Sequence, residues 1–192
     1  MNVKAEPEFR AGGLTSTDPA IRARAVEFIK QAKDVAQASG ANKVTCCPLG
    51  DGYEFAFQCD YAQMWKHLVE TFGEAGSYKP EVPLFIEYKP SETRGRCFVD
   101  TGAKTLCLLN DIGVPAMGVT MDFGHSKYGQ ENPAEVVALL ACAAKRTRGD
   151  TLFFTVNVRN HTTRAQPVRL KAVCGPGDDA EPCITLMAET EE

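Results

Sequence analysis

Apolar, strand-like segments recur along most of this chain and alternate with segments that have the apolar spacing of helices. Strand starts are predicted near Val3, Val44, Leu84, Val119 and Leu152, between 33 and 41 residues apart. A strand can join a parallel neighbour only through a long crossover, which is usually a helix. The alternation therefore predicts an α/β fold of parallel βα units.

The segment "STDPAIRARAVEFIKQAKDVAQASG" carries the clearest helix signals. Asp18 suits the N-cap, Pro19 the first helical position and Gly40 the end of the helix. Apolar residues recur from Ile21 to Ala36 at steps of three and four, Val35 among them, and predict one buried stripe. Further helices are predicted over "YAQMWKHLVETFGEA", "TGAKTLCLLNDIG" and "PAEVVALLACAAKR". In the first of these we expect His67 to face solvent, and we assign it no role.

The sequence pattern changes toward the C-terminus. The segments "FTVNVRN" and "QPVRLKAV" alternate apolar and polar residues, which is typical of half-solvated antiparallel strands. We expect a β-hairpin or a poorly ordered tail there and not another βα unit. The prediction is thus a (β/α) domain over residues 1–148, followed by a last strand and a divergent tail over residues 149–192.

Composition restricts the classes of partner. The formal net charge is −4, so no nucleic acid and no anionic membrane surface is expected as a partner. No apolar run approaches the roughly 20 residues that cross a bilayer. The start of the chain, "MNVKAEPEFRAGG", has no apolar signal core, so we expect a cytoplasmic protein. The 8 cysteines form no C-x-x-C pair, and most are expected to be reduced core residues.

Charged residues gather where two neighbouring strands end. "VPLFIEYK" ends with Glu87 and Lys89, which share one face because they lie two apart on a strand. The next strand ends in "MDFGHS", which supplies Asp122 and His125. Neighbouring strands lie about 4.8 Å apart, so Asp122 can reach the site that Glu87 faces. Two converging carboxylates repel unless a cation lies between them, and oxygen ligands beside an imidazole suit Mg²⁺ or Mn²⁺.

Lys89, in the same space, would donate to a substrate oxygen while the carboxylates keep it charged. The alternative is an ordinary polar rim with ion pairs at the mouth of a sheet. Tyr53, Phe55 and Phe57 alternate in the loop after "KVTCCPL". They either wall a small-molecule pocket, with Tyr53 and Phe57 as substrate contacts, or form a packed lid or short hairpin.

The segment "EYKPSETRG", with "TMDFGHS" one βα unit later, resembles the xylose isomerase-like barrel family of sugar isomerases and sugar-phosphate epimerases. "DGYEFAFQCDY" and "GQENPAEVVALLA" are similar to segments of that family too. The resemblance implies a TIM-barrel-type (β/α) fold with a divalent metal, Mn²⁺, Mg²⁺ or Co²⁺, near its axis. It implies that Glu87, Asp122 and His125 belong to the metal site, and that His125 also contacts substrate. Lys89 matches the lysine that polarises the substrate oxygen in aldose–ketose isomerases.

The implied activity is metal-dependent isomerisation or epimerisation of a sugar or sugar phosphate, with Glu87, Lys89 and His125 as the catalytic candidates. The lysine of Glu-x-Lys favours isomerisation. An eight-stranded barrel takes about 250 residues, and only about five strands are predicted here, so we expect an incomplete barrel, a truncated member of the family. Asn157 stands where the resemblance implies a further histidine ligand. A non-catalytic sugar-binding or regulatory remnant therefore stays open, and the open sheet edges favour a homo-oligomer, another pairing or aggregation.

Overall fold

The computed structural model describes residues 1–144, 151–158, 166–176 and 182–190. The chain divides into two compact units, Met1–Glu131 and Asn132–Glu192. The helices of the first unit are the 3₁₀ helices η1 (Val3–Ala5) and η2 (Pro7–Phe9) and the α-helices α1 (Pro19–Ser39), α2 (Tyr61–Ser77), α3 (Gly102–Ile112) and α4 (Phe123–Tyr128). Its strands are β1 (Val44–Cys46), β2 (Gly52–Tyr53), β3 (Leu84–Glu87), β4 (Arg96–Cys97) and β5 (Met117–Thr120). The second unit contains α5 (Pro133–Ala144), β6 (Thr151–Val158), β7 (Gln166–Pro176) and β8 (Pro182–Ala188).

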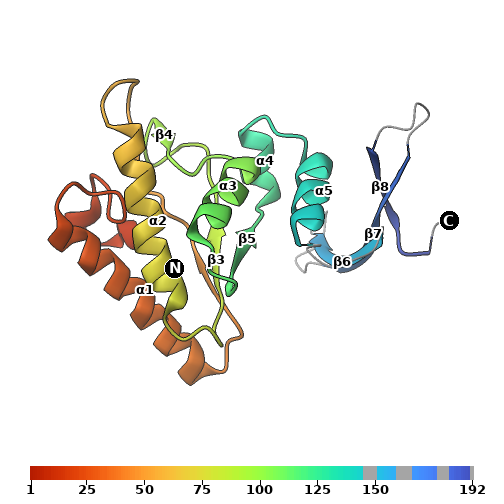
Figure 1. The fold of residues 1–192 in the computed structure, drawn as a ribbon, viewed down its shortest axis with the longest axis horizontal. Helices are drawn as coiled ribbons and strands as arrows, with labels where there is room; N and C mark the ends of the chain where they lie inside the picture. The colour runs from red at the N-terminus through yellow and green to blue at the C-terminus, as the bar shows by residue number, and fades with distance from the viewer. Residues whose placement is uncertain (145–150, 159–165, 177–181, 191–192) are drawn as a thin grey trace. The chain divides into compact units, whose positions relative to one another are not determined.

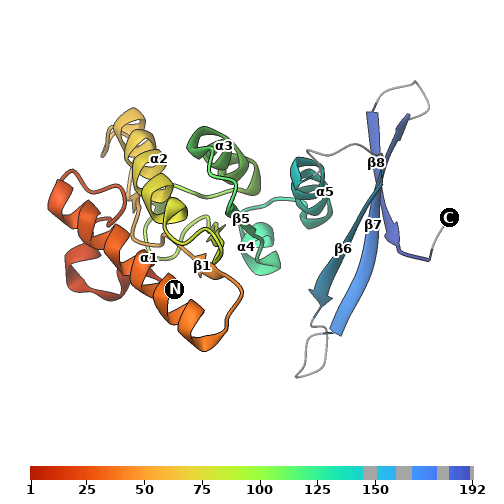
Figure 2. The same ribbon diagram turned by 60° about the horizontal axis from the view of Figure 1, so that its bottom comes forward.

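Strands β1, β3 and β5 form a parallel sheet in that order, which confirms the predicted βα units. Leu84 pairs with Val44 on one side and with Met117 on the other, so the three strands are aligned from their first residues. Helix α2 connects β1 to β3, and α3 connects β3 to β5. Helix α1 packs against α2, and α2 against α3 (Figures 1 and 2). The parallel strands and their helices form part of the wall of a (β/α) barrel. In the described part of the chain, the three strands of this sheet do not close into a full barrel.

The two faces of the sheet differ in their side chains. Leu84 and Ile86 are fully buried, whereas Phe85 and Glu87 point to the opposite face and are half-buried. On that opposite face, the hydroxyl oxygens of Thr45 and Thr120, from the two outer strands, lie 3.1 Å apart. Side chains of strands that are not neighbours meet in this way only if the sheet curves toward them. Glu87 therefore stands on the concave face of the sheet.

One predicted strand is wrong, and another is outside the parallel sheet, as its alternating pattern indicated. Val3–Ala5 forms η1, because the Asn2 side chain accepts a hydrogen bond from the Lys4 backbone and caps a helical turn. The segment Thr151–Val158 is a strand, but it pairs antiparallel with β7. Strands β6, β7 and β8 form an antiparallel sheet, as the alternating pattern predicted for this part of the chain. Residues 149–150, 159–165, 177–181 and 191–192 of the predicted tail lie outside the described residues.

Helix α1 has the predicted ends. The Asp18 carboxylate accepts from the Ala20 backbone, and Gly40 ends the helix with a φ of 74°. Its buried stripe differs from the prediction, because Val35 is 68% exposed and Lys33 is fully buried. None of the helices in the described ranges combines the length and apolar character of a membrane span.

Buried Lys33 joins α1 to the end of α2. Its ammonium group donates to the carbonyl oxygens of Ala75 and Gly76, at 3.2 and 3.1 Å. The last carbonyls of a helix have no partner within the helix, so Lys33 supplies the donor that they lack. Burial lowers the pKa of Lys33, and the charge of Glu81 opposes that effect.

We expect Lys33→Met to lower the free energy of unfolding by about 1 to 3 kcal/mol, because it leaves two buried carbonyl groups without donors while it keeps the apolar stem. Urea denaturation followed by circular dichroism measures this. Lys66, whose side chain is 67% exposed, gives the control Lys66→Met, for which a change within about 0.5 kcal/mol is expected. Equal stabilities of the two variants would show that Lys33 does not serve as a helix cap.

Candidate metal centre

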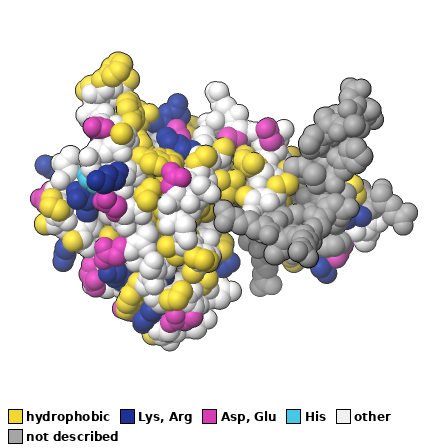
Figure 3. Space-filling view, in the orientation of Figure 1, with side chains coloured by type: hydrophobic (Ala, Val, Ile, Leu, Met, Phe, Trp, Pro, Cys, Tyr) yellow, Lys and Arg dark blue, Asp and Glu magenta, His cyan; other side chains and the backbone are white. Residues whose placement is uncertain are grey.

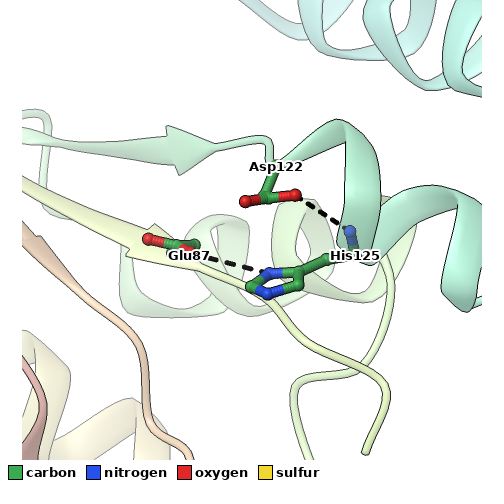
Figure 4. Close-up of side chains that lie close together, drawn as sticks. All are labelled: Glu87, Asp122 and His125. Carbon is green, nitrogen blue, oxygen red and sulfur yellow. Dashed lines mark hydrogen bonds and ion pairs between the residues drawn. The ribbon is translucent and has the colours of Figure 1, made fainter. Parts of the chain in front are cut away.

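Glu87, Asp122 and His125 lie together at the C-terminal ends of β3 and β5 (Figure 4). One potential ligand atom from each side chain lies within 4.8 Å of those of the other two. Glu87 is the last residue of β3 and pairs with Thr120, the last residue of β5. Asp122 follows Thr120 by two positions, so the register of two neighbouring strands brings these carboxylates together.

Asp122 also begins helix α4, where a loop was predicted. Its Oδ1 accepts a hydrogen bond from the His125 backbone nitrogen at 3.0 Å, so the aspartate is the N-cap of this short helix. The aspartate three residues before His125 was the signal for this helix in the sequence. The cap places the imidazole on the same side of the strand ends as the two carboxylates (Figure 4).

The backbone of Tyr88 orients the His125 ring. Nδ1 of His125 is 3.0 Å from the Tyr88 carbonyl oxygen and 3.5 Å from Glu87 Oε1. A carbonyl oxygen can only accept, so Nδ1 carries the proton in the neutral ring. Nε2 then presents its lone pair to a metal ion or to a substrate hydroxyl.

The three side chains fit a divalent cation after they rotate. Ligand atoms bound to one Mg²⁺ or Mn²⁺ ion at about 2.1 Å lie at most about 4.2 Å apart. The 4.8 Å within which one potential ligand atom of each side chain lies exceeds this, and Nδ1 is the His125 nitrogen that lies near Glu87, so an ion held through Nε2 requires rotation of the side chains and of the His125 ring. Two oxygen donors and one imidazole suit Mg²⁺, Mn²⁺, Co²⁺ or Zn²⁺. Asp122 is exposed, so water would supply the remaining ligands.

Lys89 has a different ionic partner from the one predicted. Its ammonium group is ion-paired with Glu92, and not with Glu87 or Asp122 among the described ion pairs. The hydrogen bond with Glu92 raises the pKa of Lys89 and lowers the pKa of Glu92. The positive charge of Lys89 is therefore stabilised, as predicted, but by Glu92 in the loop that follows β3 and not by the carboxylates at the strand ends. The Lys-x-x-Glu spacing was the sequence signal for this pair.

Cys47 is a neighbour of the site that the sequence-based prediction missed. It follows β1 at the position level with Glu87 and is buried. Burial, then the nearby Glu87 and Cys97, raise the pKa of Cys47 to about 12, and the charge of Lys89 opposes them. The thiol is therefore protonated at neutral pH and does not offer a thiolate ligand.

For the aromatic loop after β1, the sequence left a pocket wall and a packed lid or short hairpin as alternatives. Gly52–Tyr53 pairs with Arg96–Cys97 in a two-stranded ribbon, and the Tyr53 ring packs edge-on against Tyr61 at 5.3 Å. Phe57 is 94% exposed, in the loop that forms the hydrophobic tip at the top of Figure 3. None of the contacts described for Tyr53 or Phe57 joins them to the candidate ligands.

The prediction that His67 faces solvent is wrong, because the buried face of α2 is wider than its apolar stripe. His67 is 6% exposed, with Nδ1 3.3 Å from the Thr15 carbonyl oxygen and Nε2 2.6 Å from the Gln63 side-chain nitrogen. It lines a cavity of about 380 Å³ together with Ser16, Asp60 and Arg94. This cavity does not include the three candidate ligands.

The sequence matches the family described as the xylose isomerase-like TIM barrel over residues 5–154. The chain belongs to this family. The match confirms the predicted resemblance and, with the parallel β1–β3–β5 sheet, the predicted barrel-type fold. Asn157, where the resemblance implied a further histidine, lies in β6.

Three relatives illustrate the similarity. The xylose isomerase of Thermus caldophilus is 26% identical over 149 residues, which are 75% of this chain and 38% of that protein. D-Allulose 3-epimerase from Methylomonas sp., also known in complex with D-allulose, aligns with a TM-score of 0.58 at 20% identity, over 69% of this chain and 46% of the epimerase. The zinc-bound IOLI protein aligns with a TM-score of 0.54 at 16% identity, over 67% of this chain and 44% of that protein. The chain thus spans less than half of each relative, and the structural alignments show a shared fold.

We expect Glu87→Gln to weaken Mn²⁺ binding on the order of 10-fold or more, because it removes one of two anionic ligands without changing the shape of the side chain. Electron paramagnetic resonance of free Mn²⁺ during a titration measures this. Glu74→Gln, on an exposed part of α2, is the matched control for loss of one negative charge. Equal Mn²⁺ affinities of the two variants would exclude Glu87 as a ligand.

Proposed function

We propose that this chain carries part of the active site of a divalent-metal-dependent sugar isomerase or epimerase. The observation that carries the proposal is the convergence of Glu87, Asp122 and His125 at the carboxyl ends of parallel strands. In (β/α) barrels that end of the strands is where catalytic groups lie. Family membership and the similarity to a xylose isomerase and a sugar epimerase support the same chemistry.

The roles of the residues follow from their geometry. When bound, a divalent cation such as Mn²⁺, Mg²⁺ or Co²⁺ polarises the carbonyl group of the sugar. Glu87 and Asp122 supply the negative charge that holds this ion. His125 keeps its proton on Nδ1, toward the Tyr88 carbonyl, so Nε2 is an acceptor for the ion or for a substrate hydroxyl.

Lys89 is the residue that favours isomerisation within this proposal. Its side chain is 16% exposed and ion-paired with Glu92, so it is charged and lies close to the strand end. The other member of the pair, Glu92, is 55% exposed, so water can replace the ammonium group as the partner of its carboxylate. Lys89 is therefore able to leave Glu92 and donate to the carbonyl oxygen of a bound sugar.

A second candidate is sugar binding without catalysis. The candidate ligands come from only two strands, and Asp122 is exposed. A centre with few protein ligands binds its metal weakly and orients a substrate poorly. The partner in both proposals is a small sugar or sugar phosphate. A homo-oligomer and a cytoplasmic location stay predictions.

We expect the chain with Mn²⁺ to interconvert aldo and keto forms of pentoses or hexoses, or to epimerise them, and to lose this activity with a chelator. Glu87→Gln should lower the rate at least about 100-fold, and Glu74→Gln should leave it unchanged. Chromatography of the sugar products measures both. Lys89→Met separates the two reactions, because an isomerase that depends on this ammonium group loses its rate and an epimerase does not.

Conversion at the same rate in wild type and Glu87→Gln would refute the proposed catalytic centre. Sugar binding that depends on Glu87, measured by calorimetry, in a chain that converts no sugar would support the second candidate in place of catalysis.

A further inference from the structure

The cavity that His67 lines is a second candidate site in the first unit. It has a volume of about 380 Å³, within the range of small-molecule sites, and we call it the side cavity. Its wall comes from the loop before α1, the loop before α2, the first two turns of α2 and Arg94. Neither Glu87, Asp122 nor His125 lines it, so it is separate from the candidate metal centre.

Hydrogen bonds hold the loop before α1 against the rest of the wall. The buried Asp51 carboxylate accepts from the backbone nitrogen and from the hydroxyl of Thr15, each at 2.7 Å. The Thr15 carbonyl oxygen is 3.3 Å from Nδ1 of His67, so this nitrogen carries the proton. Nε2 of His67 then accepts from the side-chain nitrogen of Gln63 at 2.6 Å.

Arg94 fixes another part of the wall. Its Nη1 donates to the Arg10 carbonyl oxygen at 3.2 Å, and its Nε lies 2.7 Å from Glu54 Oε1. The Arg94 side chain is 11% exposed, so these contacts leave it few other positions. The side cavity thus has a fixed shape, as small-molecule sites usually have.

Several polar groups in the wall keep hydrogen-bonding capacity. Asp60 caps α2 through Oδ1, which accepts from the Gln63 backbone nitrogen at 2.9 Å, and its Oδ2 has no partner among the described hydrogen bonds. The same is true, among those bonds, of the side-chain oxygen of Gln63, of Nη2 of Arg94 and of the Thr17 hydroxyl. Met64, which is buried, adds an apolar surface. The wall therefore offers donors and acceptors beside an apolar group.

The charges in the wall restrict the kind of ligand. Asp60 is exposed, and its carboxylate would repel a phosphate or carboxylate group. The Arg94 charge, although Glu54 partly balances it, would repel an ammonium group. A hydroxyl group suits both, because it donates to a carboxylate and accepts from a guanidinium. A neutral compound with several hydroxyl groups therefore matches the wall best.

We propose that the side cavity binds a neutral polyol of about the size of xylitol. Its hydroxyl groups donate to Asp60 Oδ2 and to the Gln63 side-chain oxygen and accept from Arg94, while its C–H groups contact Met64. Binding here needs no metal, so this inference does not rest on the proposed function.

The test is a titration with xylitol in the presence of a chelator. Xylitol has no carbonyl group to convert, and the chelator keeps metal ions from the candidate metal centre. The readout is the ¹³C-methyl NMR signal of Met64, which is one of 5 methionines and is assigned with Met64→Leu. The signal should shift and saturate with a Kd on the order of 1 mM, as expected for a small ligand at a site with an exposed rim. Inorganic phosphate should not shift it.

Asp60→Asn is the deciding variant. Asparagine caps a helix as well as aspartate does, so α2 keeps its start, but an amide donor replaces the acceptor Oδ2. The Kd for xylitol should rise about 10-fold or more, because a hydrogen bond to a charged group is lost. Asp18→Asn is the matched control. Asp18 caps α1 in the same way, through Ala20, and does not line the side cavity, so the Kd should stay unchanged.

No shift of the Met64 signal at about 100 mM xylitol, far above the expected Kd, would overturn the proposal. So would a shift with phosphate in place of xylitol, or equal xylitol affinities of Asp60→Asn and Asp18→Asn. Failure of the proposed function is a different result, because it consists of the absence of Mn²⁺ binding and of sugar conversion, and neither enters this titration.

Discussion

The in-register pairing of β3 with β5 is the constraint on which the candidate centre depends. Because Glu87 pairs with Thr120, the residues that follow the two strands emerge side by side, and Asp122 reaches the space that Glu87 faces. A slip of one residue would turn Glu87 to the opposite face of the sheet. The buried Leu84 and Ile86 prevent such a slip, since it would place both apolar side chains on the half-exposed face. Core packing thus fixes the geometry of the polar site.

This arrangement has an electrostatic cost that a cation would remove. Two carboxylates whose oxygens lie within 4.8 Å of each other repel, most strongly where the protein shields them from water. Lys89 is paired with Glu92, so among the described ion pairs only the His125 ring reaches Glu87. The site therefore combines two carboxylates with an imidazole that a backbone carbonyl orients. Two carboxylates held close together destabilise the fold unless a cation lies between them. This set of side chains is therefore better suited to binding a divalent ion than to stabilising the fold.

The sequence predicted those features that depend on short-range patterns. Asp18 and Gly40 bound α1 as expected, and the spacing of strands and helices gave the parallel sheet. The alternation after Leu152 indicated antiparallel pairing, which the structure shows in β6. The convergence of Glu87 with Asp122 followed from two general facts: side chains alternate along a strand, and parallel strands end at one edge of a sheet.

Other features depend on long-range contacts that periodicity does not contain. Val3 lies in a helical turn because the neighbouring Asn2 caps it, and a three-residue apolar pattern cannot distinguish this from a strand. His67 is buried because the loop that contains Thr15 covers that side of α2. The hydrogen bond from the Gly102 backbone nitrogen to the Glu131 carboxylate joins segments far apart in the sequence, so no local pattern indicated it.

The central claim is that one cation binds between Glu87, Asp122 and His125. The most direct measurement is X-ray diffraction from crystals soaked in Mn²⁺, with an anomalous difference map at the manganese edge. We expect a single strong peak about 2.1 to 2.3 Å from an oxygen of Glu87, an oxygen of Asp122 and Nε2 of His125. A map with no peak between these side chains at saturating Mn²⁺, or with the two carboxylates turned apart to solvent, would contradict the account.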